Sequence, residues 1–200
     1  MSRDSPYNGS MIIHDILRDS YQNTLKALVM GTSPESLARA RERAFVKALA
    51  TQFEARYEGE EFRTFSLYGR GNLADFGGEQ LLFDIEVCRV ASASSAQRKK
   101  ETFYVVREAL WQVEIDLSQD WRRVVFAMNR LRCGAAENKL VIAAAPRTAQ
   151  DNFLKTLEQP DAVPGEKFYL ATIPHPRDWE DDEETLMIWQ FAEGEWQAVT

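Results

Sequence analysis

The chain has 200 residues, enough for one domain with a sizeable core. Its 44% hydrophobic and 28% charged residues are close to the average of soluble globular proteins, which argues against wholesale disorder. The formal net charge of −7 argues against a protein whose whole surface grips nucleic acid, because affinity for phosphates comes mainly from clustered lysine and arginine; a local basic face is compatible with this balance.

The cysteines and the apolar segments indicate the cellular compartment in which the protein is expected. Cys88 and Cys133 are too few for a disulfide framework and lack the spacing of metal ligands. The N-terminus lacks the apolar core of a signal peptide, and no apolar run approaches the roughly 18 residues of a membrane span. The sequence therefore predicts a cytoplasmic protein with reduced thiols and no membrane contact.

The first third of the chain predicts two helices, a strand and a turn region. Apolar residues recur at helical spacing over 11–30. Ser33 is a plausible N-cap, followed by a proline at the first helical position, so a second helix is expected over 34 to about 57. The segment 63–69 reads as a short strand and the glycine-rich segment 69–80 as turns.

The rest of the chain predicts a hairpin followed by alternating helices and strands. Strands over 81–90 and 103–117 form the hairpin around a polar exposed loop. Ser118 is expected to cap a helix over 119–132 whose buried face includes Trp121. After it we expect a strand over 139–146, a helix over 147–159, a strand over 166–174 and a terminal hairpin over about 185–199. This order predicts a single α/β domain whose later strands are parallel through crossover helices.

Acidic residues repeat on one face of the predicted hairpin. Side chains alternate faces along a strand, so Gln112, Glu114 and Asp116 share the face opposite a mainly apolar one. In the neighbouring strand, Asp84 and Glu86 share a face by the same alternation. Two adjacent strands thus each carry an acidic pair.

Three interpretations of these acids are open at this level. Burying carboxylates close together is costly unless protons or cations compensate, and oxygen ligands suit Mg²⁺ or Mn²⁺. Alternatively, the face is solvated, as is common in antiparallel sheets. A third possibility is structural ion pairing with Arg89, Arg107 or Arg122.

The order of elements and acids resembles the PD-(D/E)xK nuclease superfamily, which has the restriction-endonuclease-like fold. The resemblance covers about residues 34–173, with Asp84 in LLFDIEV and Glu114 in WQVEID at the motif positions. It implies a mixed central sheet flanked by helices, to which this chain adds the helix over 11–30 and the hairpin near the C-terminus. It further implies that Asp84 and Glu114, with the backbone carbonyl of Ile115, hold a Mg²⁺ or Mn²⁺ ion for phosphodiester hydrolysis.

One motif position departs from this pattern. Asp116 stands where the superfamily has lysine, so catalysis is in question even if the fold is shared. Lys139 and Lys47 are the substitutes that can be named. Without a lysine, positioning of the attacking water would depend on Asp116 or on the ion, and Asp116 or Glu86 could ligate a second ion or orient the water.

The superfamily also places a glutamate on its first helix. The apolar stripe of the helix over 34–57 consists of Phe45, Val46, Leu49 and Phe53. At about 100° per residue, Glu42 falls within this stripe, whereas Glu54 falls on the polar face. We expect Glu42 to be the helical site residue, with Glu54 second; a buried ion pair between Glu42 and a nearby arginine is the alternative.

Basic residues near the acids predict phosphate contacts. Arg122 and Arg123 follow the acidic strand, and Arg98, Lys99 and Lys100 lie in the hairpin loop. The leading hypothesis is a metal-dependent nuclease acting on DNA rather than RNA. The alternative is an inactive member of the same fold that serves as a binding or regulatory subunit, with a protein partner or a second copy.

Overall fold

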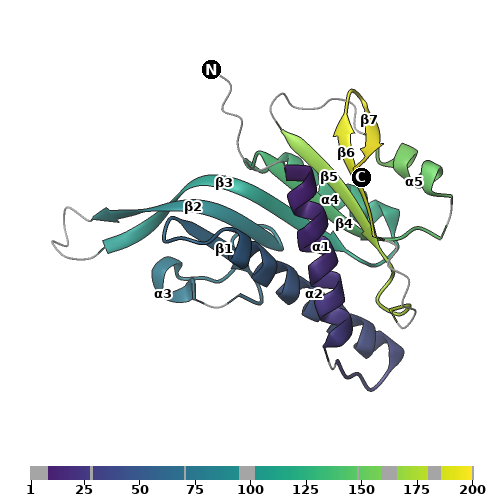
Figure 1. Ribbon diagram of the computed structural model, residues 1–200, viewed down its shortest axis with the longest axis horizontal. Coiled ribbons are helices and arrows are strands. Elements are labelled where there is room, and N and C mark those ends of the chain that lie inside the picture. The colour runs from purple at the N-terminus through teal and green to yellow at the C-terminus, as the bar shows by residue number, and fades with distance from the viewer. Residues whose placement is uncertain are drawn as a thin grey trace.

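The computed structural model describes residues 9–27, 29–69, 71–94, 102–147, 149–158, 166–179 and 186–199. Within these ranges, seven strands form one mixed sheet in the order β1 to β7, with helices packed on both of its faces (Figure 1). The elements are α1 (Gly9–Lys26), α2 (Pro34–Arg56), β1 (Phe62–Ser66), α3 (Leu73–Phe76), β2 (Ile85–Ser94), β3 (Thr102–Asp116), α4 (Trp121–Arg132), β4 (Asn138–Ala144), α5 (Gln150–Thr156), β5 (Lys167–Ile173), β6 (Met187–Ala192) and β7 (Glu195–Ala198).

The strand directions confirm the predicted α/β class. β1, β2 and β3 pair antiparallel, β3, β4 and β5 pair parallel, and β6 and β7 return antiparallel. α4 and α5 connect the parallel strands, as the sequence predicts. The terminal hairpin turns at Glu193 and Gly194, whose φ angles of 55° and 87° are both positive, as a two-residue hairpin turn of type I′ requires.

Two helical layers bury the centre of the sheet from both sides. α1 and α2 cover one face through a core that includes Phe45, Leu49 and Phe53. α4 and α5 cover the other face through Val124, Met128 and Phe153. Because both faces of β3 are covered near its end, the polar residues there are buried whichever way they point.

The N-terminal helices follow local sequence signals. Ser33 caps α2 as predicted: its hydroxyl accepts a hydrogen bond from Ser36 N, while the Ser36 hydroxyl accepts one from Ser33 N. α1 ends at Lys26, earlier than the predicted residue 30. Met30 is 80% exposed, so no apolar surface buries a further turn.

The glycine-rich segment is not only turns. It contains the short helix α3, whose N-terminal amides are bound by a carboxylate: Glu79 accepts hydrogen bonds from the N–H groups of Gly71, Asn72 and Leu73. The Phe76 ring packs edge-on against Phe65 at 4.9 Å between centroids. A long-range aromatic contact and a side chain six to eight residues away therefore decide this helix.

The predicted start of α4 was wrong. Its N-cap is Asp120, which accepts a hydrogen bond from Arg122 N, whereas the Ser118 hydroxyl donates to Asp116 Oδ1 at 2.5 Å. Trp121 was expected in the buried face, but it is 47% exposed. It lies in the first turn of α4, where its indole borders a surface cavity.

β2 starts later and ends later than predicted. It runs from Ile85 to Ser94, so Asp84 precedes the strand and the first four residues of the expected loop are paired. Register shifts after Val87 and after Arg89 interrupt the strict alternation of faces. In Figure 1 the far end of the β2–β3 ribbon extends away from the helices. The loop residues 95–101 lie outside the described ranges.

The thiols and the C-terminal tryptophans lie as follows. Both cysteines are free, Cys88 buried and Cys133 exposed. Trp189 is buried in the core beneath α4 and α5, and Trp196 Nε1 donates to Leu157 O. These tryptophans therefore pack within the chain. Across the described ranges, none of the helices is long and apolar enough to cross a membrane.

Candidate functional site

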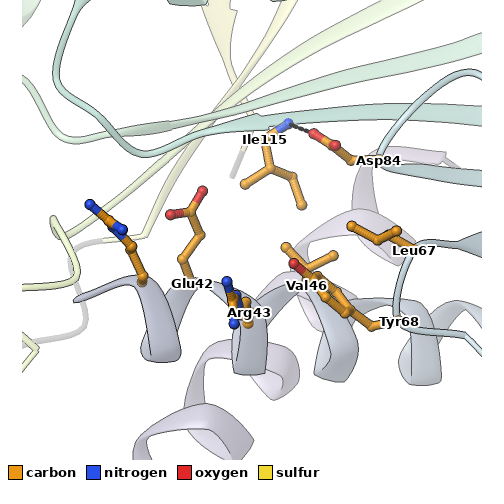
Figure 2. A pocket seen from close by; sticks show the side chains of 8 residues that line it. Glu42, Arg43, Val46, Leu67, Tyr68, Asp84 and Ile115 are labelled. Atoms are coloured by element: carbon orange, nitrogen blue, oxygen red, sulfur yellow. Dashed lines mark hydrogen bonds between the residues drawn. The ribbon is translucent and has the colours of Figure 1, made fainter. Parts of the chain in front are cut away.

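The acids singled out in the sequence meet where β2 begins and β3 ends. Ile85 pairs with Val113, so extending this antiparallel register by one step places Asp84 opposite Glu114. Asp84 Oδ2 accepts a hydrogen bond from Ile115 N at 2.8 Å, which Figure 2 shows as a dashed line. The carboxylate of Asp84 thus lies beside the backbone of β3, beyond the paired end of β2.

Glu114 is the most unusual member of this group. It is 4% exposed, and its Oε2 lies 3.1 Å from Arg130 Nη1. Its Oε1 is buried and has no hydrogen-bond partner among the residues that the structure describes. Burial, together with the negative charge of Asp84, raises the pKa of Glu114 to about 8, although Arg130 opposes the shift. The site therefore strongly disfavours the ionised form unless a further cation is present.

Asp116, two residues further along β3, is fully engaged by its neighbours. Its Oδ2 forms an ion pair with Arg123 Nε at 2.8 Å, and its Oδ1 accepts hydrogen bonds from the backbone and the hydroxyl of Ser118. Asp116 thus closes the end of β3 and holds the first turns of α4 against it.

Opposing effects act on the pKa of Asp84. Burial raises its pKa most, while the hydrogen bond from Ile115 and the charge of Arg130 lower it. Arg130 also donates from Nη2 to Leu82 O at 2.6 Å, so it ties the segment before β2 to Glu114 on β3. This arginine fixes the geometry of the two acids relative to each other.

Glu42 approaches the same place from α2. Its pKa is raised by burial first and then by the negative charges of Asp116 and Asp84. It lines a cavity of about 240 Å³ between α2 and the sheet, together with Arg39, Arg43, Val46, Leu67, Tyr68, Asp84 and Ile115. Figure 2 shows its carboxylate extending from the helix toward Ile115. Glu54, the second candidate, is exposed, and its charged neighbour is Glu79.

We refer to Glu42, Asp84, Glu114 and Asp116 as the acidic cluster. The structure brings together these four predicted site residues from α2, β3 and the segment before β2. Because Glu114 and Asp116 are buried, the interpretation of a solvated face was wrong. Ion pairs do form, but the predicted arginines were wrong: Arg89 binds Glu108, while Arg123 and Arg130 bind the acids. These two arginines lie seven residues apart and so share one face of α4.

Other predicted residues have different roles. Glu86 accepts hydrogen bonds from Gln112 Nε2 and Leu82 N. It therefore links β2 to β3 and to the segment before β2. Lys139 forms an ion pair with Glu166 at 2.7 Å, and Lys47 is exposed on α2. The cations that lower the pKa values of Glu42, Asp84 and Glu114 are arginines. Arg122 lies over the Trp121 ring, and Arg98, Lys99 and Lys100 fall outside the described ranges.

The oxygen atoms at this place fit a small hard cation. In the ranges that are described, no three His, Cys, Asp or Glu side chains form a ready metal-binding group. Mg²⁺, however, binds through one or two carboxylates and keeps several waters. Asp84, the unpartnered Oε1 of Glu114 and the carbonyl of Ile115 supply oxygen atoms of the kind that this ion prefers. The N–H and C=O of a strand residue point to the same side, so the Ile115 carbonyl faces the side on which Asp84 lies.

No protein family, no curated protein and no solved structure matches this chain in the three comparisons made.

Proposed function

We propose that the chain is a metal-dependent phosphodiesterase of nuclease type, with the restriction-endonuclease-like fold, acting on nucleic acid and on DNA rather than RNA. The observation that carries this proposal is the buried Glu114 Oε1, which has no hydrogen-bond partner among the described residues and lies on the strand beside Asp84. The element order from α2 through β5 supports the fold assignment, since apart from β1 and α3 it runs helix, hairpin, helix, strand, helix, strand.

In this proposal Asp84 and Glu114 hold Mg²⁺ or Mn²⁺ with the Ile115 carbonyl. When bound, the ion supplies Lewis-acid chemistry, lowering the pKa of a coordinated water and neutralising charge on the scissile phosphodiester. Glu42 lines the open cavity next to Asp84, and burial raises its pKa, so its carboxylate holds a proton more readily than an exposed glutamate does. Arg123 is 66% exposed, which leaves its guanidinium accessible to a substrate phosphate.

The test is cleavage of plasmid and oligonucleotide DNA with Mg²⁺ or Mn²⁺, comparing the purified wild type with Asp84→Asn and Glu114→Gln. We expect cleavage that requires the ion and is lost in both variants. Glu108→Gln is the matched control, because Glu108 lies on the same strand but forms an exposed ion pair with Arg89. Activity that is unchanged in both site variants would show that the nuclease is a contaminant or uses other residues.

A second candidate function is a non-catalytic binding subunit with the same fold. It is favoured by Asp116, which stands at the lysine position and is already neutralised by Arg123. Metal binding weaker than millimolar, together with a stable complex with a protein partner, would support this function. Site-specific micromolar binding of Mn²⁺ that is lost in Glu114→Gln would count against it.

A further inference from the structure

A second cavity, of about 340 Å³, lies at the carboxyl ends of β3 and β4, between α4 and α5. We call it the α4–α5 cavity. Its volume falls within the range of small-molecule sites, which begins at about 300 Å³. None of the acidic cluster lines it, so it is separate from the site described above.

The lining combines an apolar floor with polar groups at the rim. Val124 and Phe153 are buried and form part of the floor. Trp121 forms a wall, with nearly half of its surface exposed. Gln119, Arg147 and Asn152 supply an amide, a guanidinium and a second amide. A flat ring with hydrogen-bonding atoms on its edge fits this lining. The ring can stack on the indole of Trp121, and the two amides can bind the atoms on its edge.

The charge of the cavity favours a ligand that carries phosphate. Among the described residues, those that line it include Arg147 and no aspartate or glutamate, although the whole chain has a formal net charge of −7. The guanidinium of Arg122 lies 5.3 Å from the centroid of the Trp121 ring. Cationic groups therefore flank the aromatic wall, as in sites that bind nucleic-acid bases together with their backbone.

The α4–α5 cavity lies close to the acidic cluster along the chain. Gln119 follows Asp116 by three residues, so their Cα atoms are at most about 10 Å apart. Gln119 has a φ of 62°, and this left-handed conformation turns the chain from β3 toward α4. Trp121 and Arg123 share the first turn of α4, and Arg123 binds Asp116. A short stretch of chain therefore joins the two places.

We propose that the α4–α5 cavity binds an unpaired base of the substrate strand, stacked on Trp121, so that the chain acts on single-stranded nucleic acid or on duplex with an unpaired base. The substrate in this inference rests on the proposed function. The physical reason is that a base inside a duplex has no free face, whereas an unpaired base can leave the strand and enter a pocket.

The experiment measures binding without chemistry. Fluorescence anisotropy with a labelled single-stranded oligonucleotide, and with the same sequence as duplex, is recorded in EDTA for the wild type and for Trp121→Ala. We expect the single strand to bind more tightly than the duplex, and Trp121→Ala to weaken binding of the single strand about tenfold. Trp121→Phe, which keeps an aromatic face, should restore most of the affinity.

Phe126→Ala is the matched control. Phe126 lies on the same helix and is also well exposed, at 66%, but it does not line the α4–α5 cavity. Its removal should leave both affinities unchanged. Equal affinity of the wild type and Trp121→Ala for the single strand, with both proteins shown to be folded by thermal melting, would overturn the inference. Equal affinity of the wild type for single strand and duplex would also overturn it.

Two further measurements separate the possible ligands and the two proposals. A deoxynucleoside monophosphate, added by titration, should compete weakly with the oligonucleotide. Tight binding of the mononucleotide with no binding of the strand would assign the cavity to a free nucleotide and overturn the inference. Base binding that depends on Trp121 in a protein without cleavage activity would reject the nuclease proposal alone. Cleavage that requires Glu114 but is indifferent to Trp121 and to strand pairing would reject the cavity proposal alone.

Discussion

The stability of the protein should depend on pH through Glu114. Its pKa is raised from 4.5 to about 8, mainly by burial and by the nearby charge of Asp84. Between these two values the folded state holds a proton that the unfolded state has released. The free energy of unfolding therefore falls as pH rises through this window. At about 1.4 kcal/mol per pH unit, the loss between pH 5 and pH 8 is roughly 3 to 4 kcal/mol.

Glu114→Gln removes this dependence while keeping the size of the side chain. Its amide oxygen can still accept the hydrogen bond from Arg130. We expect the variant to gain stability relative to the wild type as pH rises, by about 3 kcal/mol from pH 5 to pH 8. Urea unfolding at several pH values measures this difference, since the midpoint and slope give the free energy of unfolding.

The refuting result is a difference between the wild type and Glu114→Gln that stays constant from pH 5 to pH 8. It would mean that Glu114 ionises normally, which requires water or a protein cation at its Oε1. Glu108→Gln serves as the control, because its exposed ion pair with Arg89 contributes little to stability. Its difference from the wild type should not follow the predicted curve.

Two other predictions follow from the same region. Binding of Mn²⁺ near pH 7 should release a proton from Glu114. The heat of binding in calorimetry should therefore change with the ionisation enthalpy of the buffer at pH 7 but not at pH 9. Equal heats in different buffers at pH 7 would count against Glu114 as a ligand. Gly134→Ala should destabilise the fold by about 2 kcal/mol in urea unfolding, because the new Cβ would lie 2.0 Å from Gln112 Oε1. That oxygen accepts a hydrogen bond from Ala136 N, which the shift would break. An unchanged midpoint would show that Gln112 can move freely.

Local signals were enough for most of the fold. Helical spacing and the Ser33 cap predict α2 closely, and runs of apolar residues predict β4 and β5. The parallel arrangement follows from the alternation of strands and helices, since a crossover helix returns the chain in the same direction. The errors were at places where a distant residue decides. Phe65 and Glu79 stabilise α3, and Asp116 takes the hydroxyl of Ser118 that the sequence assigned to a helix cap.

The candidate site was predictable in its members but not in its environment. Strand alternation selects Glu114 and Asp116, and the helical stripe selects Glu42 in preference to Glu54. The partners Arg123 and Arg130 were missed as ion-pair partners, although they share one face of the helix that follows the acidic strand. That spacing of seven residues was the available signal. Which of the arginines reach the acids depends on the rotation of α4 over the sheet.

By itself the sequence determined the order of the main elements and the α/β class, because these depend on periodicities that act over a few residues. The four acids were selected by the same periodicities together with the resemblance to a nuclease superfamily. Only the tertiary structure decided that Glu114 is buried with one unpartnered oxygen. Burial of that face of β3 depends on α4, which the crossover from β3 to β4 places over it. The energy of a carboxylate depends on everything packed around it, and that environment is assembled from α2, α4 and the segment before β2.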